Sequence, residues 1–226
     1  MSSPPIPKPP DGDVIQSQGY IAGIITLTVA AVLVAWLRMY VRTFISRNLG
    51  WDDYTMFAAS LITVVTNAFL ILGYKYGMGR HIYYVPPANL PKVFMWLWAG
   101  EPTNLFAVFL VRLSICLFFM RLVPPQKKIY AWTIWVLIAL LTVSAVFTSV
   151  YYFFECRPIE KVWRPKEVEG ECFSSRVQEA ATWLYQATSI IGDLVLLMIP
   201  VTLFWRLNVR TRTKIGLIVI CSLGIL

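Results

Sequence analysis

Long apolar stretches separated by short polar segments dominate this chain. Five of them are long enough to cross a bilayer as helices, because about 20 apolar residues match the thickness of the hydrocarbon core. They predict membrane spans over residues 20–37, 54–74, 93–123, 129–154 and 180–205. The pattern therefore predicts an all-α fold, a polytopic transmembrane helical bundle, in which every span satisfies its own backbone hydrogen bonds.

The two ends of the chain depart from this pattern. Residues 1–19 are polar and hold five prolines in their first ten positions, so we predict a disordered N-terminal tail. The tail lacks the basic start and apolar centre of a cleavable signal peptide, and the first span is expected to act as the membrane signal. Residues 215–226 are apolar again, but as a helix they would rise only about 18 Å against a hydrocarbon core of about 30 Å. We expect a truncated sixth span in a C-terminally incomplete transmembrane domain, 20–226; a short re-entrant helix is the alternative.

Composition supports a membrane protein and argues against other classes. Apolar residues make up 58% of the chain and charged residues 14%, whereas a soluble domain carries about 25% charged residues. The net charge of +8 is concentrated in short loops beside the spans, which indicates lipid headgroups rather than nucleic acid. The chain has one histidine, and its four cysteines include no Cys-x-x-Cys pair, so we predict neither a metal site nor a cofactor. The sequence also lacks a nucleophile–base pair, so we do not expect an enzyme.

Basic residues indicate in which direction the spans run. The segments 121–128 and 206–214 hold three and four basic residues and no acidic one, and the segment 38–53 has a net charge of +1. On the opposite side, basic and acidic residues alternate in the 155–179 loop. Since basic residues in short loops favour the cytosolic side, we predict that the N-terminus lies outside and that the basic segments are cytosolic.

Two charged residues inside the predicted spans, Arg112 and Asp193, are the most informative ones. A charge at the centre of a membrane helix costs about 2.5–3.5 kcal/mol on the insertion scale. Arg112 and Asp193 lie at similar depths, about 15 and 18 Å from the cytosolic ends of their helices, so we predict that they pair inside the bundle. The alternative is that Arg112 reaches to the cytosolic surface and Asp193 is protonated. Glu101, beside Pro102, is expected to begin the regular helix of the third span.

A second charged motif lies where the first two spans meet the predicted cytosol. Arg38 and Arg42 are four residues apart and share one helix face, while Asp52 and Asp53 open the next span, where negative charge meets the positive end of the helix dipole. These four residues predict a cytosolic ion-pair cluster that holds the two spans together. Arginines that extend to the lipid headgroups, combined with simple helix capping, are the alternative.

Two further motifs lie on the predicted outer side. Gly77 and Gly79, followed by His81, predict a turn with positive φ rather than a phosphate-binding loop or a metal site. Cys156 and Cys172 share one loop that would face an oxidising compartment, so we predict a disulfide between them.

Taken in order, these motifs resemble the fungal rhodopsin-domain family of integral membrane proteins, which includes the Pth-type receptor-like proteins. The matching strings are Arg38-x-Tyr40-x-Arg42, Gly50-Trp51-Asp52-Asp53-Tyr54, Gly77-x-Gly79-x-His81, Arg112-Leu113-Ser114-Ile115 with Arg121, Cys156-Arg157-Pro158-Ile159 with Trp163 and Cys172, Asp193 with Pro200, and Lys214-Ile215-Gly216. The resemblance implies a seven-helix receptor-like fold of fungal origin. This chain has Arg112 where the family usually has lysine. The name rhodopsin implies no pigment here, because a retinal Schiff base needs a buried lysine and no predicted span contains one.

From the spans and the resemblance we expect a receptor-like integral membrane protein of the plasma membrane, without a catalytic site. Its expected partners are membrane lipids, an extracellular ligand that the sequence does not identify, and a cytosolic signalling partner. One alternative is a transporter that uses the intramembrane charges as an ion or proton path. A second alternative is a membrane protein that acts in secondary metabolism.

Overall fold

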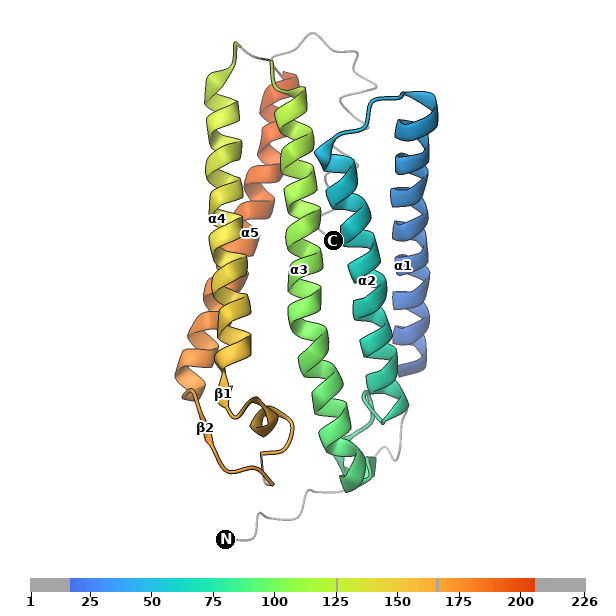
Figure 1. The fold of residues 1–226 in the computed structure, drawn as a ribbon, viewed down its shortest axis with the longest axis vertical. Helices are drawn as coiled ribbons and strands as arrows, with labels where there is room; N and C mark the ends of the chain where they lie inside the picture. Colours follow the sequence, from blue (N-terminus) through green and yellow to red (C-terminus); the bar gives the residue numbers. More distant parts are fainter. Residues whose placement is uncertain (1–16, 125, 166, 206–226) are drawn as a thin grey trace.

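Five long helices make up the computed structural model (Figure 1), which describes residues 17–124, 126–165 and 167–205. In chain order they are α1 (Ser17–Tyr40), α2 (Trp51–Lys75), α3 (Leu90–Leu122), α4 (Lys128–Phe154) and α5 (Ser175–Trp205). Each contains a stretch that is long and apolar enough to cross a membrane, so the predicted all-α bundle with five spans is confirmed. The predicted sixth segment and residues 1–16 of the predicted tail lie outside the described residues. The seven-helix resemblance stays an expectation.

The helices extend beyond the predicted spans at several ends. α1 begins at Ser17 rather than at residue 20, so the last three residues assigned to the tail are helical. Beyond Tyr40 the chain continues as a π-helical turn over Val41–Ile45. α5 begins at Ser175 rather than at residue 180. Polar residues can continue a helix into the headgroup region, so the apolar pattern alone gives helices that are too short.

The third span contradicts one expectation. α3 begins at Leu90, and Pro102 lies well inside it, so Glu101 does not mark the start of the helix. A membrane helix tolerates proline because nearby polar groups can compensate for the backbone bond that proline removes. Pro102 leaves the carbonyl oxygen of Trp98 without its usual helical donor, and α3 nevertheless continues through it. The hydroxyl of Thr103 donates nearby, to the carbonyl oxygen of Gly100 at 2.8 Å. Glu101 therefore lies within a continuous helix.

The two ends of the bundle differ in structure. At one end, which we call the cluster end, short connections join α1 to α2 and α3 to α4. At the other end, the hairpin end, an antiparallel pair of short strands lies between α4 and α5 (Figure 1). The short elements at this end are two 3-10 turns before α3 (Ile82–Tyr84 and Pro87–Asn89), β1 (Cys156–Arg157), a 3-10 turn (Ile159–Val162) and β2 (Glu171–Cys172).

α3 is the central helix of the bundle. It packs against α2 on one side and against α4 and α5 on the other, while α1 packs on α2. Figure 1 shows this order, with α1 at the edge and α3 in the middle. Side chains along α3 can therefore contact both halves of the molecule.

The apolar side chains of the bundle divide into a core and an outward surface. The core lies between α3, α4 and α5 and consists of Cys116, Phe119, Ile134, Leu137, Leu141, Leu196 and Ile199. Large apolar side chains also point outward, such as Leu33 of α1 (64% exposed) and Val143 of α4 (68% exposed). Such a surface would be a liability in water, but it fits the hydrocarbon region of a bilayer.

Candidate functional site

An intramembrane ion pair joins α3 to α5. Arg112 donates from Nε to Oδ1 of Asp193 at 2.9 Å and from Nη2 to Oδ2 at 2.8 Å, a bidentate geometry. Its Nη1 donates to the hydroxyl of Ser189 at 3.0 Å, a residue one helical turn before Asp193. The structure thus brings together the two charges that the sequence predicts to pair, and it adds Ser189, which the sequence analysis did not identify.

The two partners of this pair are buried to different degrees. The side chain of Arg112 is 13% exposed and that of Asp193 is 45% exposed. A carboxylate can become neutral by taking up a proton, whereas a guanidinium keeps its charge in proteins. Arg112 is therefore the partner that depends on the pair for charge compensation.

At the cluster end, Arg38, Arg42, Asp52 and Asp53 form one group, the Arg–Asp cluster. Arg38 donates from Nη2 to Oδ2 of Asp52 at 2.7 Å and from Nε to Oδ1 of Asp53 at 3.1 Å. Nη1 of Arg42 lies 3.7 Å from Oδ2 of Asp52 and 3.5 Å from Oδ2 of Asp53. Both aspartate side chains are almost completely buried. The structure places the four predicted residues together, and the cluster links the end of α1 to the start of α2.

One of these carboxylates also caps α2. Oδ2 of Asp53 accepts a hydrogen bond from the backbone N–H of Gly50 at 3.1 Å, which is one half of a capping box, because glycine has no side chain to form the other half. Ion pairing and helix capping are therefore not alternatives here, because Asp53 does both. Gly50 fits this site because a Cβ atom would overlap the carboxylate of Asp52 and lie 2.7 Å from Nη1 of Arg121.

α3 contributes residues to the cluster that the sequence analysis did not place there. Nη1 of Arg121 lies 3.6 Å from Oδ1 of Asp52, and its Nη2 donates to the carbonyl oxygen of Asn48 at 3.2 Å. The buried hydroxyl of Ser114 donates to the backbone oxygen of Asp52 at 2.6 Å. The ring of Phe118 lies under the guanidinium group of Arg38, 5.3 Å from its Cζ atom. The sequence does contain one signal for this: four arginines and two aspartates lie at this end of the first three spans, so the two aspartates could pair with more than Arg38 and Arg42.

A cavity of about 250 Å³ lies between α3, α4 and α5 in the half of the bundle near the hairpin end. We call it the α3–α5 cavity. Polar and aromatic groups line it: Glu101 and Leu105 of α3, Thr148, Tyr151 and Tyr152 of α4, and Ala181, Thr182, Tyr185 and Gln186 of α5. The hydroxyl oxygen of Tyr151 is buried and has no hydrogen-bond partner among the described residues. Apart from Glu101, which was assigned to a helix start, the sequence analysis found none of these residues as a site, because helix rotation decides which of them face one another.

The disulfide-bonded hairpin lies next to this cavity. Cys156 and Cys172 are paired residues of β1 and β2 and form the predicted disulfide. The ring of Phe173, directly after the bridge, stacks on the ring of Tyr151 with 6.1 Å between the ring centres. Since Tyr151 lines the cavity, the disulfide-bonded hairpin is connected to its wall through one aromatic contact.

Removing the bridge is expected to loosen the hairpin. A disulfide that closes a loop of this length stabilises a protein by about 3 kcal/mol in the chain-entropy model. We expect Cys172→Ser to lower the folding yield and the Tm, and to expose the peptide bond after Lys161 to trypsin. The double variant Cys156→Ser/Cys172→Ser should behave like the single one. A Cys172→Ser protein with unchanged Tm and cleavage rate would contradict this expectation.

Glu155, directly before the hairpin, should make its stability depend on pH. Burial raises the pKa of the Glu155 carboxyl group above its ordinary value of about 4.3. The folded state thus favours the protonated form, so the contribution of Glu155 to stability is complete below the ordinary pKa and is lost as the pH rises through the raised one. We expect Glu155→Gln, which cannot ionise, to gain Tm relative to the parent as the pH rises from about 4 to about 7. Thermal unfolding of both proteins across this range tests it; a Tm difference that is independent of pH would speak against it.

The glycine motif after α2 forms a turn. Gly77 has φ of 113° and Gly79 has φ of 83°, a region that favours glycine. His81 precedes a 3-10 turn and accepts a hydrogen bond from the backbone N–H of Tyr83 at 3.3 Å through Nδ1. Across the described residues, no three His, Cys, Asp or Glu side chains are grouped as they would be around a metal ion. The motif therefore has a local structural explanation.

Comparisons with known proteins give a family and two relatives. The family model described as the fungal rhodopsin domain matches residues 37–226. A SAT4 family membrane protein of Emericella nidulans is 25% identical over 179 residues, which cover 78% of this chain and 42% of that protein. The polyenoic acids biosynthesis gene cluster protein Ba17b of Metarhizium anisopliae is 27% identical over 210 residues, which cover 91% of this chain and 55% of that protein. The chain thus spans about half the length of these two relatives. No solved structure matches it significantly.

Proposed function

This chain belongs to the fungal rhodopsin-domain family of membrane proteins, and we propose that it acts as a receptor-like member that responds to an extracellular ligand. The ligand would bind in the α3–α5 cavity, and the response would appear at the cluster end. In this proposal the chain has no enzymatic activity, its partners are lipids and a cytosolic signalling protein, and it binds no nucleic acid.

The arrangement of polar residues along α3 carries this proposal. Glu101 lines the cavity, Arg112 forms the ion pair with α5, and Arg121 joins the Arg–Asp cluster. Glu101 and Arg121 are 20 positions apart, so one helix connects sites separated by about 30 Å. A ligand that binds one arrangement of α3 and α5 more tightly than another would shift the equilibrium between them, and with it the position of Arg121.

A recess beside the cluster could receive the cytosolic partner. It has a volume of about 400 Å³ and is lined by Arg42, Ser46, Asn48, Phe118, Arg121 and Leu122. Two of these side chains carry a positive charge, so an acidic protein segment or an anionic lipid headgroup would be attracted to it.

The proposal requires that the cluster end faces the cytosol and the N-terminus faces outward in the plasma membrane. In intact cells, an impermeant thiol reagent should label a Ser3→Cys variant. It should label a Gln126→Cys variant, in the connection between α3 and α4, only after permeabilisation. The opposite result for the two variants would reverse the orientation that the basic loops predict.

A reporter at the cluster end can separate a receptor from a transporter. In cells with a proximity-labelling enzyme inserted at Gln126, in the connection between α3 and α4, a receptor should label a cytosolic protein more strongly when the extracellular medium contains its ligand, and Arg121→Ala should reduce this labelling. In reconstituted vesicles the same protein should show no flux. Proton or substrate flux that disappears in Asp193→Asn, without ligand-dependent labelling, would refute the receptor and favour the transporter.

The printed name of one relative favours a second candidate function. The Metarhizium anisopliae protein is named for a polyenoic acids biosynthesis gene cluster. By this similarity the chain could be a membrane protein that accompanies a biosynthetic pathway in secondary metabolism. Deletion of its gene should then change the secondary metabolites of the producing fungus without changing any response to extracellular ligands.

A further inference from the structure

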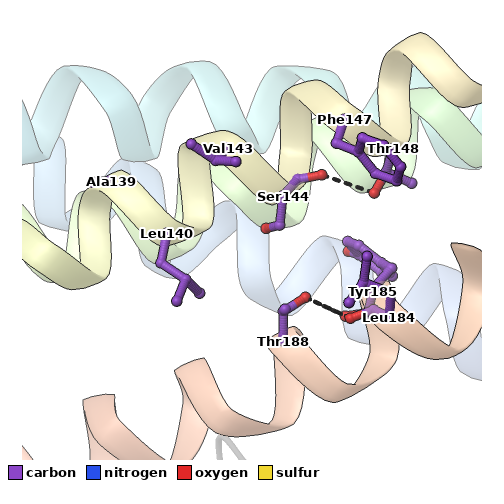
Figure 2. Close-up of a pocket in the computed structure, with 9 residues that line it drawn as sticks. All are labelled: Ala139, Leu140, Val143, Ser144, Phe147, Thr148, Leu184, Tyr185 and Thr188. Atoms are coloured by element: carbon purple, nitrogen blue, oxygen red, sulfur yellow. Dashed lines mark hydrogen bonds between the residues drawn. The ribbon is translucent and has the colours of Figure 1, made fainter.

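A second cavity adjoins the α3–α5 cavity. It is a groove between α4 and α5 with a volume of about 510 Å³, and we call it the α4–α5 groove (Figure 2). Thr148 of α4 and Tyr185 of α5 line both spaces. The two cavities are therefore adjacent, with these two side chains between them, and a molecule that passes between Thr148 and Tyr185 could occupy both.

The groove presents an apolar surface in spite of its hydroxyl groups. The hydroxyl of Ser144 donates to the backbone oxygen of Leu141 at 3.0 Å, and the hydroxyl of Thr148 donates to the backbone oxygen of Ser144 at 2.8 Å. The hydroxyl of Thr188 donates to the backbone of its own helix in the same way, as Figure 2 shows. With these groups bonded within their helices, methyl and methylene groups remain for a ligand. The groove thus suits a hydrocarbon chain.

The groove is open to the surrounding bilayer. Val143 and Phe147 line it from α4 and are 68% and 54% exposed, and Leu184 lines it from α5 and is 54% exposed. Along α4 it extends from Ala139 to Thr148, nine positions or about 14 Å of helix. A chain could enter sideways from the lipid, without passing through water.

The α3–α5 cavity supplies the polar end. Glu101 is exposed on α3, and no Lys, Arg or His of the described residues forms an ion pair with it. The hydroxyl of Tyr151 is buried there without a partner among the same residues. An ionised carboxylate only accepts hydrogen bonds, so this end favours a head that donates them and repels an anionic head.

We propose that these two adjacent cavities bind one single-chain amphiphile whose head is a hydroxyl or a protonated amine. The head lies against Glu101 and Tyr151, and the hydrocarbon chain lies in the α4–α5 groove. This inference rests on the proposed receptor function, for which it names the class of ligand. Fatty acids fit less well, because their carboxylate heads are negatively charged.

Photo-crosslinking in lipid nanodiscs tests this site. The probe is a long-chain alkyl amine with a diazirine in the middle of its alkyl chain. It is added to phosphatidylcholine nanodiscs that contain the protein, residues 1–226. Mass mapping should find the label on peptides that contain residues 139–148 and 184–188. A probe with the same alkyl chain but a carboxylate head should label these peptides at least about tenfold less. Its head would be repelled by Glu101, whereas the amine would donate a charge-assisted hydrogen bond to Glu101.

Three variants and one control locate the binding determinants. Glu101→Gln should lower labelling by the amine about tenfold or more, Tyr151→Phe should lower it severalfold, and Ala139→Trp should block the groove. Leu33→Trp, on the outward face of α1, is the matched control and should leave labelling unchanged. Tyr151→Phe keeps the ring that stacks on Phe173, so it stays informative if Glu101→Gln fails to fold.

The outcomes separate the site from the function. Equal labelling of α1 and the groove, or labelling that is insensitive to both Tyr151→Phe and Ala139→Trp, would mean adventitious lipid contact only and would overturn the proposal. Focused labelling without any effect of the amine on proximity labelling at the cluster end would support the site and count against the receptor function. A response at the cluster end to a different ligand, without focused labelling, would leave the receptor function standing and refute this ligand class.

Discussion

Replacing Asp193 by alanine is expected to destabilise the protein by about 3–5 kcal/mol, the range found when one partner of a buried ion pair is removed. Arg112 would keep only its bond to Ser189 and would retain a charge that it cannot lose. Arg112→Ala should cost less, because the side chain of Asp193 that it leaves without this partner is 45% exposed. Thermal or denaturant unfolding in nanodiscs measures both variants.

The double variant determines whether the two residues act as a pair. Arg112→Ala/Asp193→Ala should be clearly less destabilised than the sum of the single variants, because it leaves no uncompensated charge. Arg112→Lys is the control for geometry: it keeps the charge but loses the bidentate contact, so an intermediate stability is expected. Simple additivity in the cycle would remove the pair and support an arginine that reaches to the membrane surface.

Replacing Asp53 by alanine is expected to cost about 3 kcal/mol or more. The change removes the acceptor for Nε of Arg38 and for the N–H of Gly50, so it opens the Arg–Asp cluster and uncaps α2 together. Because the Asp53 side chain is 1% exposed, little water can replace these bonds. A lower unfolding free energy in nanodiscs, together with faster hydrogen exchange in the first turn of α2, would show both effects.

Arg47 offers a matched control for the loss of charge. It lies in the same connection between α1 and α2, is exposed, and forms no ion pair with another residue that the structure describes. Arg47→Gln should therefore change stability by less than about 0.5 kcal/mol. If Asp53→Ala were no worse than Arg47→Gln, the cluster would be a surface feature without a structural role.

The apolar pattern of the sequence predicted the five helices well, because the thickness of the bilayer sets their length. It also predicted similar heights along their helices for Arg112 and Asp193, which are in contact in the structure, because height depends only on the distance along a helix. It could not give rotation about the helix axis, which decides that Ser189 and not a neighbour contacts Arg112. For the same reason Arg121 was not placed in the cluster.

Proline shows a second limit of the sequence. In soluble proteins Pro102 would most often mark the first turn of a helix, which led to the wrong position for the start of α3. Inside a membrane bundle, proline is tolerated within the helix when packing and nearby hydroxyls compensate for it. The α3–α5 cavity was missed for a related reason, because its residues come from three helices and have no common motif.

The way α1 is attached has a consequence for the biosynthesis of the protein. α1 emerges from the ribosome before α2, and two basic residues, Arg38 near its end and Arg42 in the following π-helical turn, can at first be held only by lipid headgroups. Their acidic partners, Asp52 and Asp53, are synthesised shortly afterwards at the start of α2. The positive charges can thus direct the insertion of the first helix before they are neutralised within the protein. The same arginines would first fix the orientation of the nascent chain and later, once α2 is inserted, close the contact between the first two helices.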